Sequence, residues 1–256
     1  MRTLKLTVAY DGTRLVGWQR QAEGESVQGL LEDALSRFES GPVTVHGAGR
    51  TDAGVHALGQ VASVQLACGH DTGALARALN AQLPPDVRVL SIDEVASEFH
   101  ARFSARCKTY RYLLCRAPIT NPFERAFAWH VPEPLDLDAM RQGASALVGT
   151  HDFAAFQSAG TDTHGSVRTV FRSDLLTSAE PTLLRPSVTA PLLAYEICGD
   201  GFLRHMVRAI VGTLVEIGRG RRDADTIDAL LRSRRRADAG ATAPAQGLFL
   251  VRVDYD

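Results

Sequence analysis

The order in which hydrophobic periodicities follow one another constrains the fold of this chain more than any other feature of its sequence. Strands alternate their side chains between two faces, whereas helices repeat about every 3.6 residues. In the first half of the chain these periods predict a strand, a helix, two strands, a helix and a strand, at residues 4–10, from 27, 43–45, 58–66, from 71 and 87–92. The order β-α-β-β-α-β is that of a ferredoxin-like unit.

The second half of the chain repeats this order with one helix added. The predicted segments are a strand at 108–115, a helix from 138, strands at 168–176 and 193–198, an apolar helix at 202–217, a short helix after 223 and a closing strand at 248–253. We therefore expect an α+β fold of two ferredoxin-like units, with their sheets side by side and helices packed on one face. The expected domains are residues 1–104 and residues 105–256.

Composition excludes several classes of protein. Apolar residues make up 45% of the chain and charged residues 22%, as in soluble globular proteins. No apolar run approaches the roughly 18 residues of a membrane span, and the N-terminus has the pattern of a charged strand rather than that of a signal peptide. None of the four cysteines forms a C-x-x-C pair or lies at zinc-ligand spacing from a histidine. We expect a cytoplasmic protein without a membrane segment or a metal.

Charge is less decisive than composition. The net charge of -1 argues against a strongly basic nucleic-acid binder. Nearly all of the cations are arginine, however, since lysine occurs only at Lys5 and Lys108, and arginines gather at 219–222 and 232–236. The planar guanidinium suits phosphate, so a neutral protein can still present a basic face. The alternative, which charge alone favours, is that these arginines are solvated helix ends.

Residues 47–57, Gly-Ala-Gly-Arg-Thr-Asp-Ala-Gly-Val-His-Ala, form the most informative segment. Its closely spaced glycines indicate a tight backbone, but Asp52 stands where a dinucleotide fingerprint needs its third glycine, and the Gly-Lys-Ser/Thr of a P-loop is missing. What remains is a carboxylate and a guanidinium, those of Asp52 and Arg50, displayed on a loop between two strands. The plainer alternative is that Asp52 only caps a turn.

Two other kinds of site use residues of this type. A metal could be held by His46, Asp52 and His56, but His46 lies in a strand and no second carboxylate accompanies the three. A glycosidase would need a pair of carboxylates, for which Asp11 is the possible partner of Asp52. We favour neither kind of site.

The apolar helix at 202–217 carries two arginines, Arg204 and Arg208, one turn apart on the same face. A guanidinium within an apolar helix needs an anionic partner or a bound phosphate, and Asp52 is the best candidate. Such a pair would keep the carboxylate ionised in a closed pocket, and a carboxylate nucleophile must be ionised. The alternative is that Arg208 reaches the helix edge and extends into solvent.

Residues 108–112, Lys-Thr-Tyr-Arg-Tyr, alternate so that Lys108, Tyr110 and Tyr112 share one strand face and Arg111 lies on the other. Aromatic rings beside cations suit RNA, because a ring stacks on a base while the cations meet phosphate. The alternative is an ordinary strand made of good β-formers.

Together these segments and several others resemble the TruA family of tRNA pseudouridine synthases, over nearly the whole chain. The motifs that carry the resemblance are Tyr10-Asp11-Gly12-Thr13 followed by Gly17-Trp18-Gln19-Arg20-Gln21, then residues 47–57, Phe99-His100-Ala101-Arg102-Phe103, residues 108–112, Gly149-Thr150-His151-Asp152-Phe153, residues 201–212 and Gly247-Leu248. The resemblance implies isomerisation of uridine to pseudouridine at positions 38, 39 and 40 of the tRNA anticodon arm. It also implies a homodimer that binds RNA across both subunits and needs no cofactor or metal.

The resemblance also assigns roles to individual residues. The implied site consists of Asp52 as nucleophile, Arg208 as its basic partner, Tyr110 stacked on the target uracil, Leu248 as an apolar wall, Arg50 in base flipping and RNA contact, and Gln19 and Arg20 as further substrate-binding residues.

Two other function classes stay open on the sequence alone. An RNA-binding module without catalysis could be built from two ferredoxin-like units, but it would show the aromatic RNP pattern, which is absent from the chain. A carboxylate hydrolase acting on nucleosides or glycosides would need a second acid beside Asp52.

Overall fold

The computed structural model describes residues 1–39, 41–158, 165–177 and 192–255, and it divides into two compact units. One unit comprises residues 1–108 and 249–256, and the other comprises residues 109–248. The closing strand is therefore counted with the N-terminal unit, whereas the predicted domain 105–256 includes it. The predicted domain boundaries remain a prediction.

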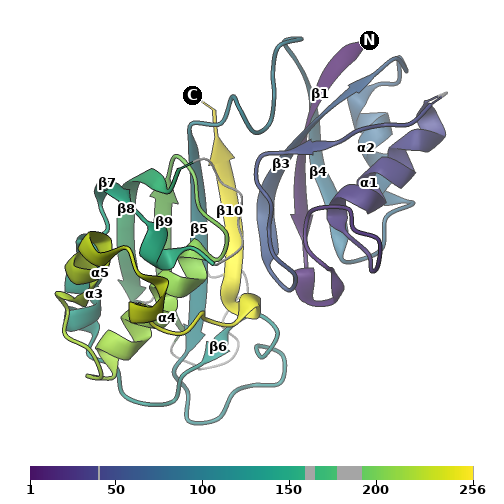
Figure 1. The fold of residues 1–256 in the computed structure, drawn as a ribbon. Helices are drawn as coiled ribbons and strands as arrows, with labels where there is room; N and C mark the ends of the chain where they lie inside the picture. The colour runs from purple at the N-terminus through teal and green to yellow at the C-terminus, as the bar shows by residue number, and fades with distance from the viewer. Residues whose placement is uncertain (40, 159–164, 178–191, 256) are drawn as a thin grey trace. The chain divides into compact units, whose positions relative to one another are not determined.

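The N-terminal unit follows the predicted order of elements. They are β1 (Arg2–Tyr10), α1 (Val27–Leu35), β2 (His46–Gly47), β3 (His56–Leu66), α2 (Thr72–Asn80) and β4 (Val87–Val95), with β10 (Leu248–Asp254) added from the end of the chain. β1 lies between β3 and β4 (Figure 1) and runs antiparallel to both. β2 pairs antiparallel and β10 parallel with β3. This arrangement confirms the ferredoxin-like pattern, although β2 lies slightly later than the expected residues 43–45.

Side-chain oxygens fix where the helices of this unit begin. Ser26 accepts a hydrogen bond from the N–H of Gly29 in α1, and Asp71 accepts one from the N–H of Ala74 in α2. These caps satisfy N–H groups that have no partner within a helix. Both helices lie on one face of the sheet (Figure 1), and the core between them includes Leu4, Leu6 and Val8 of β1, Leu31 and Leu35 of α1, and Leu75 and Leu79 of α2.

The C-terminal unit contains a sheet of strand order β5-β9-β8-β7, with β6 parallel to β5. Its elements are β5 (Cys107–Cys115), β6 (Trp129–His130), α3 (Leu137–Ser145), β7 (Gly149–Asp152), β8 (Val167–Thr177), β9 (Leu192–Gly199), α4 (Met206–Gly218) and α5 (Thr226–Ser233). The strands and helices that the periodicity predicted are present. β6 and β7 were not predicted, because such short strands show no measurable period.

The apolar helix α4 is buried along most of its length, as expected of a core helix. It begins at Met206 rather than at residue 202, because His205 has a left-handed backbone with φ 63°. The prediction that Arg204 occupies a helix face one turn before Arg208 is therefore wrong. Arg204 precedes the helix and is exposed.

Residues 240–244, which we call the α4 strap, pack along this helix without regular structure. Gly240 donates its N–H to Thr213 Oγ1 at 3.0 Å, and Ala243 donates its N–H to the carbonyl of Arg208 at 3.0 Å. A Cβ on Gly212 would lie 1.7 Å from the carbonyl oxygen of Ala241. Strap and helix thus meet backbone to backbone at Gly212.

In the part of the chain that is described, no helix has the length and apolarity needed to cross a membrane.

The contact at Gly212 predicts that Gly212→Ala destabilises the protein. The added methyl group overlaps a backbone atom, which cannot rotate away, so the strap must move off the helix. Overpacking of this kind costs about 1–3 kcal/mol, against a gain in helix propensity of about 1 kcal/mol. We expect a fall of several degrees in the midpoint of thermal unfolding. Gly69→Ala, at a position with no atom within 4 Å, is the control and should leave the midpoint nearly unchanged. Equal stability of the two variants would contradict this packing.

Candidate active site

The loop between β2 and β3 displays Arg50 and Asp52, and its backbone is anchored on both sides. Trp18 donates its N–H to the carbonyl of Thr51 at 3.1 Å, and Gly54 donates to the carbonyl of Leu15 at 3.4 Å. Within the loop, the N–H of Val55 is bonded to the carbonyl of Asp52 at 3.1 Å. The residues that flank Asp52 are thus fixed by the segment that follows β1.

Two glycines let that segment approach so closely. Gly17 has φ +102°, and a Cβ there would lie 2.5 Å from the carbonyl oxygen of Thr51. A Cβ on Gly12 would lie 2.1 Å from the carbonyl oxygen of Val55. Only glycine avoids both overlaps, and only glycine readily adopts the backbone of Gly17. The two glycine motifs at the start of the chain therefore form the support behind the Asp52 loop.

Buried polar side chains support the same loop from the sheet. Tyr10 is buried, and its hydroxyl lies 2.8 Å from Thr51 Oγ1. Burial raises the pKa of Tyr10 to about 12, so the phenol stays neutral at ordinary pH. Gln60, also buried, donates from Nε2 to the carbonyl of Gly49 at 2.9 Å. These contacts sit on either side of Arg50.

Arg50 and Asp52 are the most accessible functional groups of the loop. Arg50 is exposed and makes no hydrogen bond or ion pair within the described residues, while Asp52 is partly exposed. A loop whose backbone is fixed and whose charged side chains reach solvent is suited to binding and chemistry rather than to packing.

His56 has a structural role. Its ring is buried and stacks on Phe249, with ring centroids 4.7 Å apart. Gly12 donates its N–H to His56 Nδ1 at 3.0 Å, so that nitrogen acts as an acceptor. Asp11 Oδ1 lies 3.2 Å from the same nitrogen. Because Nδ1 already accepts from Gly12, this contact is not an ion pair, and it arises because Asp11 precedes Gly12 in the turn.

Asp11 and His46, the other residues considered for a metal site or as a second acid, make contacts of a different kind. Asp11 Oδ1 accepts hydrogen bonds from the N–H and the hydroxyl of Thr13, at 2.9 and 2.6 Å, and so caps the turn after β1. His46 is exposed, and its ring lies beside that of His100. Over the described ranges, no group of three or more His, Cys, Asp or Glu side chains is arranged to hold a metal ion.

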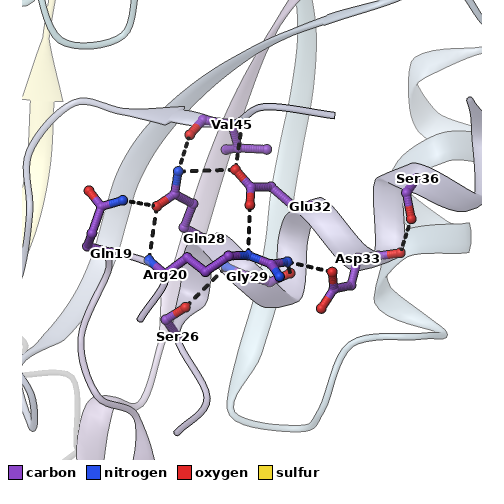
Figure 2. Close-up of polar contacts among 9 residues, drawn as sticks. All are labelled: Gln19, Arg20, Ser26, Gln28, Gly29, Glu32, Asp33, Ser36 and Val45. Atoms are coloured by element: carbon purple, nitrogen blue, oxygen red, sulfur yellow. Dashed lines mark hydrogen bonds and ion pairs between the residues drawn. The ribbon is translucent and has the colours of Figure 1, made fainter. Parts of the chain in front are cut away.

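Gln19 and Arg20, which were expected to bind substrate, contact α1. Arg20 donates from Nε to Glu32 at 3.0 Å and from Nη2 to the carbonyl of Gly29 at 3.0 Å, and it also pairs with Asp33 (Figure 2). Gln19 donates from Nε2 to Gln28 at 2.7 Å. Both side chains thus point to the helix, and their contact with a substrate stays a prediction.

Gln28 uses all of its hydrogen-bonding capacity in this network (Figure 2). Its Oε1 accepts from Gln19 Nε2 and from the backbone N–H of Arg20, at 2.7 and 3.0 Å. Its Nε2 donates to the carbonyl of Val45 at 3.0 Å and to Glu32 Oε1 at 3.1 Å. Gln28 thereby links Gln19 and Arg20, which follow the residues that support the Asp52 loop, to Val45, which leads into the loop.

Glu32 completes the network, because its Oε1 also accepts from the backbone N–H of Val45 at 3.1 Å. Trp18 adds an apolar contact between the same segments, since a Cβ on Gly47 would lie 2.3 Å from its ring. Sequence reasoning missed Gln28 and Glu32. Their spacing of four residues on one helix face was the available signal, but it did not identify backbone partners elsewhere in the chain.

In the C-terminal unit, the α4 strap orients Arg208. Arg208 donates from Nε to the carbonyl of Ala243 at 2.8 Å, and its side chain is half-buried, so it does not simply extend into solvent. The predicted ion pair with Asp52, which belongs to the other unit, stays a prediction. Leu248, the expected apolar wall, is buried at the first residue of β10.

The tyrosines of β5 are buried in the same unit. Tyr110 packs edge-on against Phe202, with centroids 5.1 Å apart, and Tyr112 donates its hydroxyl to the carbonyl of Pro244 at 2.8 Å. Burial raises the pKa of Tyr112, so it acts as a neutral donor. Arg111 pairs with the buried Glu196 at 2.7 Å, which gives it a structural role.

The network around Gln28 predicts that Gln28→Ala destabilises the N-terminal unit. The substitution removes four hydrogen bonds, three of them partly buried, at a net cost of about 0.5–1.5 kcal/mol for each buried bond. We expect a loss of about 2–3 kcal/mol in urea unfolding, reduced slightly by the better helix propensity of alanine. Gln142→Ala, at an exposed position of α3, is the matched control and should have little effect. If Gln28→Ala is as stable as this control, the network contributes nothing.

Comparison with known proteins gives consistent matches over the whole chain. A family model described as tRNA pseudouridine synthase matches residues 6–104 and 144–256. A protein of Syntrophotalea carbinolica named tRNA pseudouridine synthase A is 44% identical and covers 100% of this chain and 97% of its own length. Proteins of the same name from Acetivibrio thermocellus and Geobacter sp. strain M21 are 43% and 42% identical, each over 100% of this chain and 100% and 99% of their own.

Proposed function

The chain belongs to the tRNA pseudouridine synthase family of isomerases, and from that premise we propose that it converts uridine to pseudouridine at positions 38, 39 and 40 of the tRNA anticodon stem-loop, with the Asp52 carboxylate as nucleophile. One observation carries the assignment of Asp52. The nearby Thr51 and Val55 are fixed by backbone contacts with Gly12, Gly17 and Trp18, while Asp52 itself stays partly exposed.

The reaction explains why a fixed carboxylate is needed. The bond from N1 of uracil to C1′ of ribose breaks, the base rotates and a bond forms from C5 to C1′. C5 then loses its proton and N1 gains one, so that the product is an isomer of the substrate. Asp52 either attacks C1′, adds to C6 of the base or removes the proton from C2′. Each of these steps needs an anion held close to both sugar and base, and positioning of this kind supplies much of the catalytic effect.

The target uridine must leave its stack before Asp52 can reach it, at a cost of a few kcal/mol. We propose that Arg50 offsets this cost by filling the vacated stack or by holding a phosphate. Its exposure and its lack of a partner in the described chain support that role. Tyr110 is proposed to stack on the extruded uracil and Leu248 to close the pocket.

Arg208 is proposed as the basic partner of Asp52. The bond from Nε to the carbonyl of Ala243 fixes the plane of its guanidinium, which favours a directed ion pair over a mobile one. When tRNA excludes water from the pocket, a carboxylate without a cation beside it would be costly to keep ionised. The guanidinium of Arg208 would offset this cost and keep Asp52 ionised. Gln19 and Arg20 are proposed as further substrate-binding residues.

The remaining proposals rest on the resemblance alone. They are a homodimer in which the tRNA contacts both subunits, a cytoplasmic location and the absence of a cofactor or metal. Residues 1–104 would carry the aspartate loop, and residues 105–256 would complete the cleft.

The assignment predicts that Asp52→Asn abolishes turnover and leaves tRNA binding intact. The amide keeps the shape of the side chain and removes the charge, so we expect a loss of at least about a thousandfold in pseudouridine formed, measured by nucleoside analysis of the digested tRNA. Asp71→Asn is the matched control, because asparagine caps α2 as well as aspartate does. Substantial turnover in the Asp52→Asn enzyme would refute the assignment.

A further inference from the structure

A row of aromatic rings lies on the N-terminal unit, apart from the Asp52 loop. The ring centroids of His46 and His100 are 5.0 Å apart, and those of His100 and Phe103 are 4.4 Å apart. The guanidinium of Arg102 lies over the Phe103 ring, 5.5 Å from its centroid. We call these four residues the aromatic ledge. The motif at residues 99–103 was noted in the sequence, and nothing above assigns it a role.

The backbone beneath the ledge is fixed by several hydrogen bonds. His100 Nδ1 accepts from the N–H of Arg102 at 3.1 Å, while Ser104 bonds to both the N–H and the carbonyl of His100, at 3.1 and 2.9 Å. Ala101 donates its N–H to Ser63 Oγ at 3.0 Å, and its carbonyl accepts from the hydroxyl of Tyr255 at 2.8 Å. The backbone of the turn and the His100 ring are thus fixed before any ligand binds.

Burial of apolar surface does not explain the position of Phe103, at one end of this row. The Phe103 ring is 76% exposed, so it gains little from removal of apolar surface from water. The ring continues a row of two further rings and carries a guanidinium on its face, and a contiguous surface of this kind is suited to stacking a ligand. His46, at the other end of the row, is exposed as well.

The charge around the ledge favours an anionic ligand with flat rings. Residues 99–108 contain Arg102, Arg106 and Lys108 and no acidic residue. Burial, the neighbouring His46 and Arg102 lower the pKa of His100, so its ring is neutral at ordinary pH and suited to stacking. Aromatic faces interleaved with guanidinium groups are the means by which proteins hold unpaired nucleotides.

We propose that the aromatic ledge is a second RNA-binding site, which stacks a nucleotide of the tRNA on Phe103 and holds its phosphate with Arg102. This inference rests on the proposed function, since it takes tRNA as the ligand. The nucleotide is not the target uridine. β2 pairs His46 with Ser63, seven residues along β3 from His56, which places the ledge on the order of 20 Å from the Asp52 end of that strand.

The test measures the affinity of the full-length enzyme for unmodified tRNA. Stacking of one base contributes about 1–3 kcal/mol, so Phe103→Ala should raise Kd roughly 5- to 150-fold. Phe103→Trp should restore affinity, because any aromatic face can stack. Arg102→Gln should weaken binding and lower the slope of log Kd against log salt by about 0.7–0.9, the contribution of one phosphate contact.

Phe123→Ala is the matched control. Phe123 is 83% exposed on the loop after β5, and no aromatic ring or guanidinium packs on it in the described part of the chain. Its removal should leave Kd unchanged. Wild-type affinity in Phe103→Ala would overturn the proposal, and so would a Phe103→Trp enzyme that binds as weakly as Phe103→Ala.

The Kd ratios are read independently of catalysis, so failure of the ledge and failure of the proposed function are distinguishable. If Phe103→Ala binds tRNA with an unchanged Kd and still forms pseudouridine, the proposed role of the ledge is refuted and the proposed function is not. A wild-type enzyme that binds tRNA through the ledge but forms no pseudouridine removes the function instead. If the ledge binds a protein segment rather than RNA, Phe103→Ala and Arg102→Gln leave tRNA affinity and its salt dependence unaltered, which also overturns the proposal.

Discussion

The close approach of two backbone segments, residues 12–18 and 51–55, is the constraint on which the proposed active site depends. The carbonyl oxygens of Thr51 and Val55 occupy the space that side chains on Gly17 and Gly12 would need. That approach leaves the loop no freedom behind Asp52, so the carboxylate is presented from a fixed backbone. A nucleophile that must reach one sugar or base atom gains from this preorganisation, because the ordering entropy is lost during folding rather than during the reaction.

Support of the loop extends into α1 through polar contacts. Gln28 and Glu32 bond to Val45, which leads into the loop, and to Gln19 and Arg20, which follow the residues that support it. In the C-terminal unit the α4 strap plays a comparable part, since its Ala243 carbonyl fixes Arg208 and its Pro244 carbonyl accepts from Tyr112. Each unit thus holds its charged candidate residue through neighbouring backbone rather than through side chains alone.

The sequence predicted what periodicity and composition determine. It gave the alternating strands, the core helix α4 and the Asp52 loop, because side-chain period and glycine spacing are local properties. It did not predict that α4 begins at Met206, since the left-handed backbone of His205 follows from packing and not from a glycine. Gln28 was missed for a related reason, because its partners are backbone atoms far from it in sequence. The ion pairs of Arg20 with acids of α1 were missed as well, because no local signal reveals them, and its contact with substrate stays a prediction.

The most direct test of the central claim is the release of tritium from uridine labelled at C5, in unmodified tRNA and without added metal. Bond formation from C5 to the ribose must expel that hydrogen, whichever role Asp52 takes. The account predicts tritium release from the wild-type enzyme, confined to transcripts with uridine at positions 38, 39 or 40. Tight binding of the same tRNA with no tritium released would contradict it, and would leave an RNA-binding scaffold without chemistry.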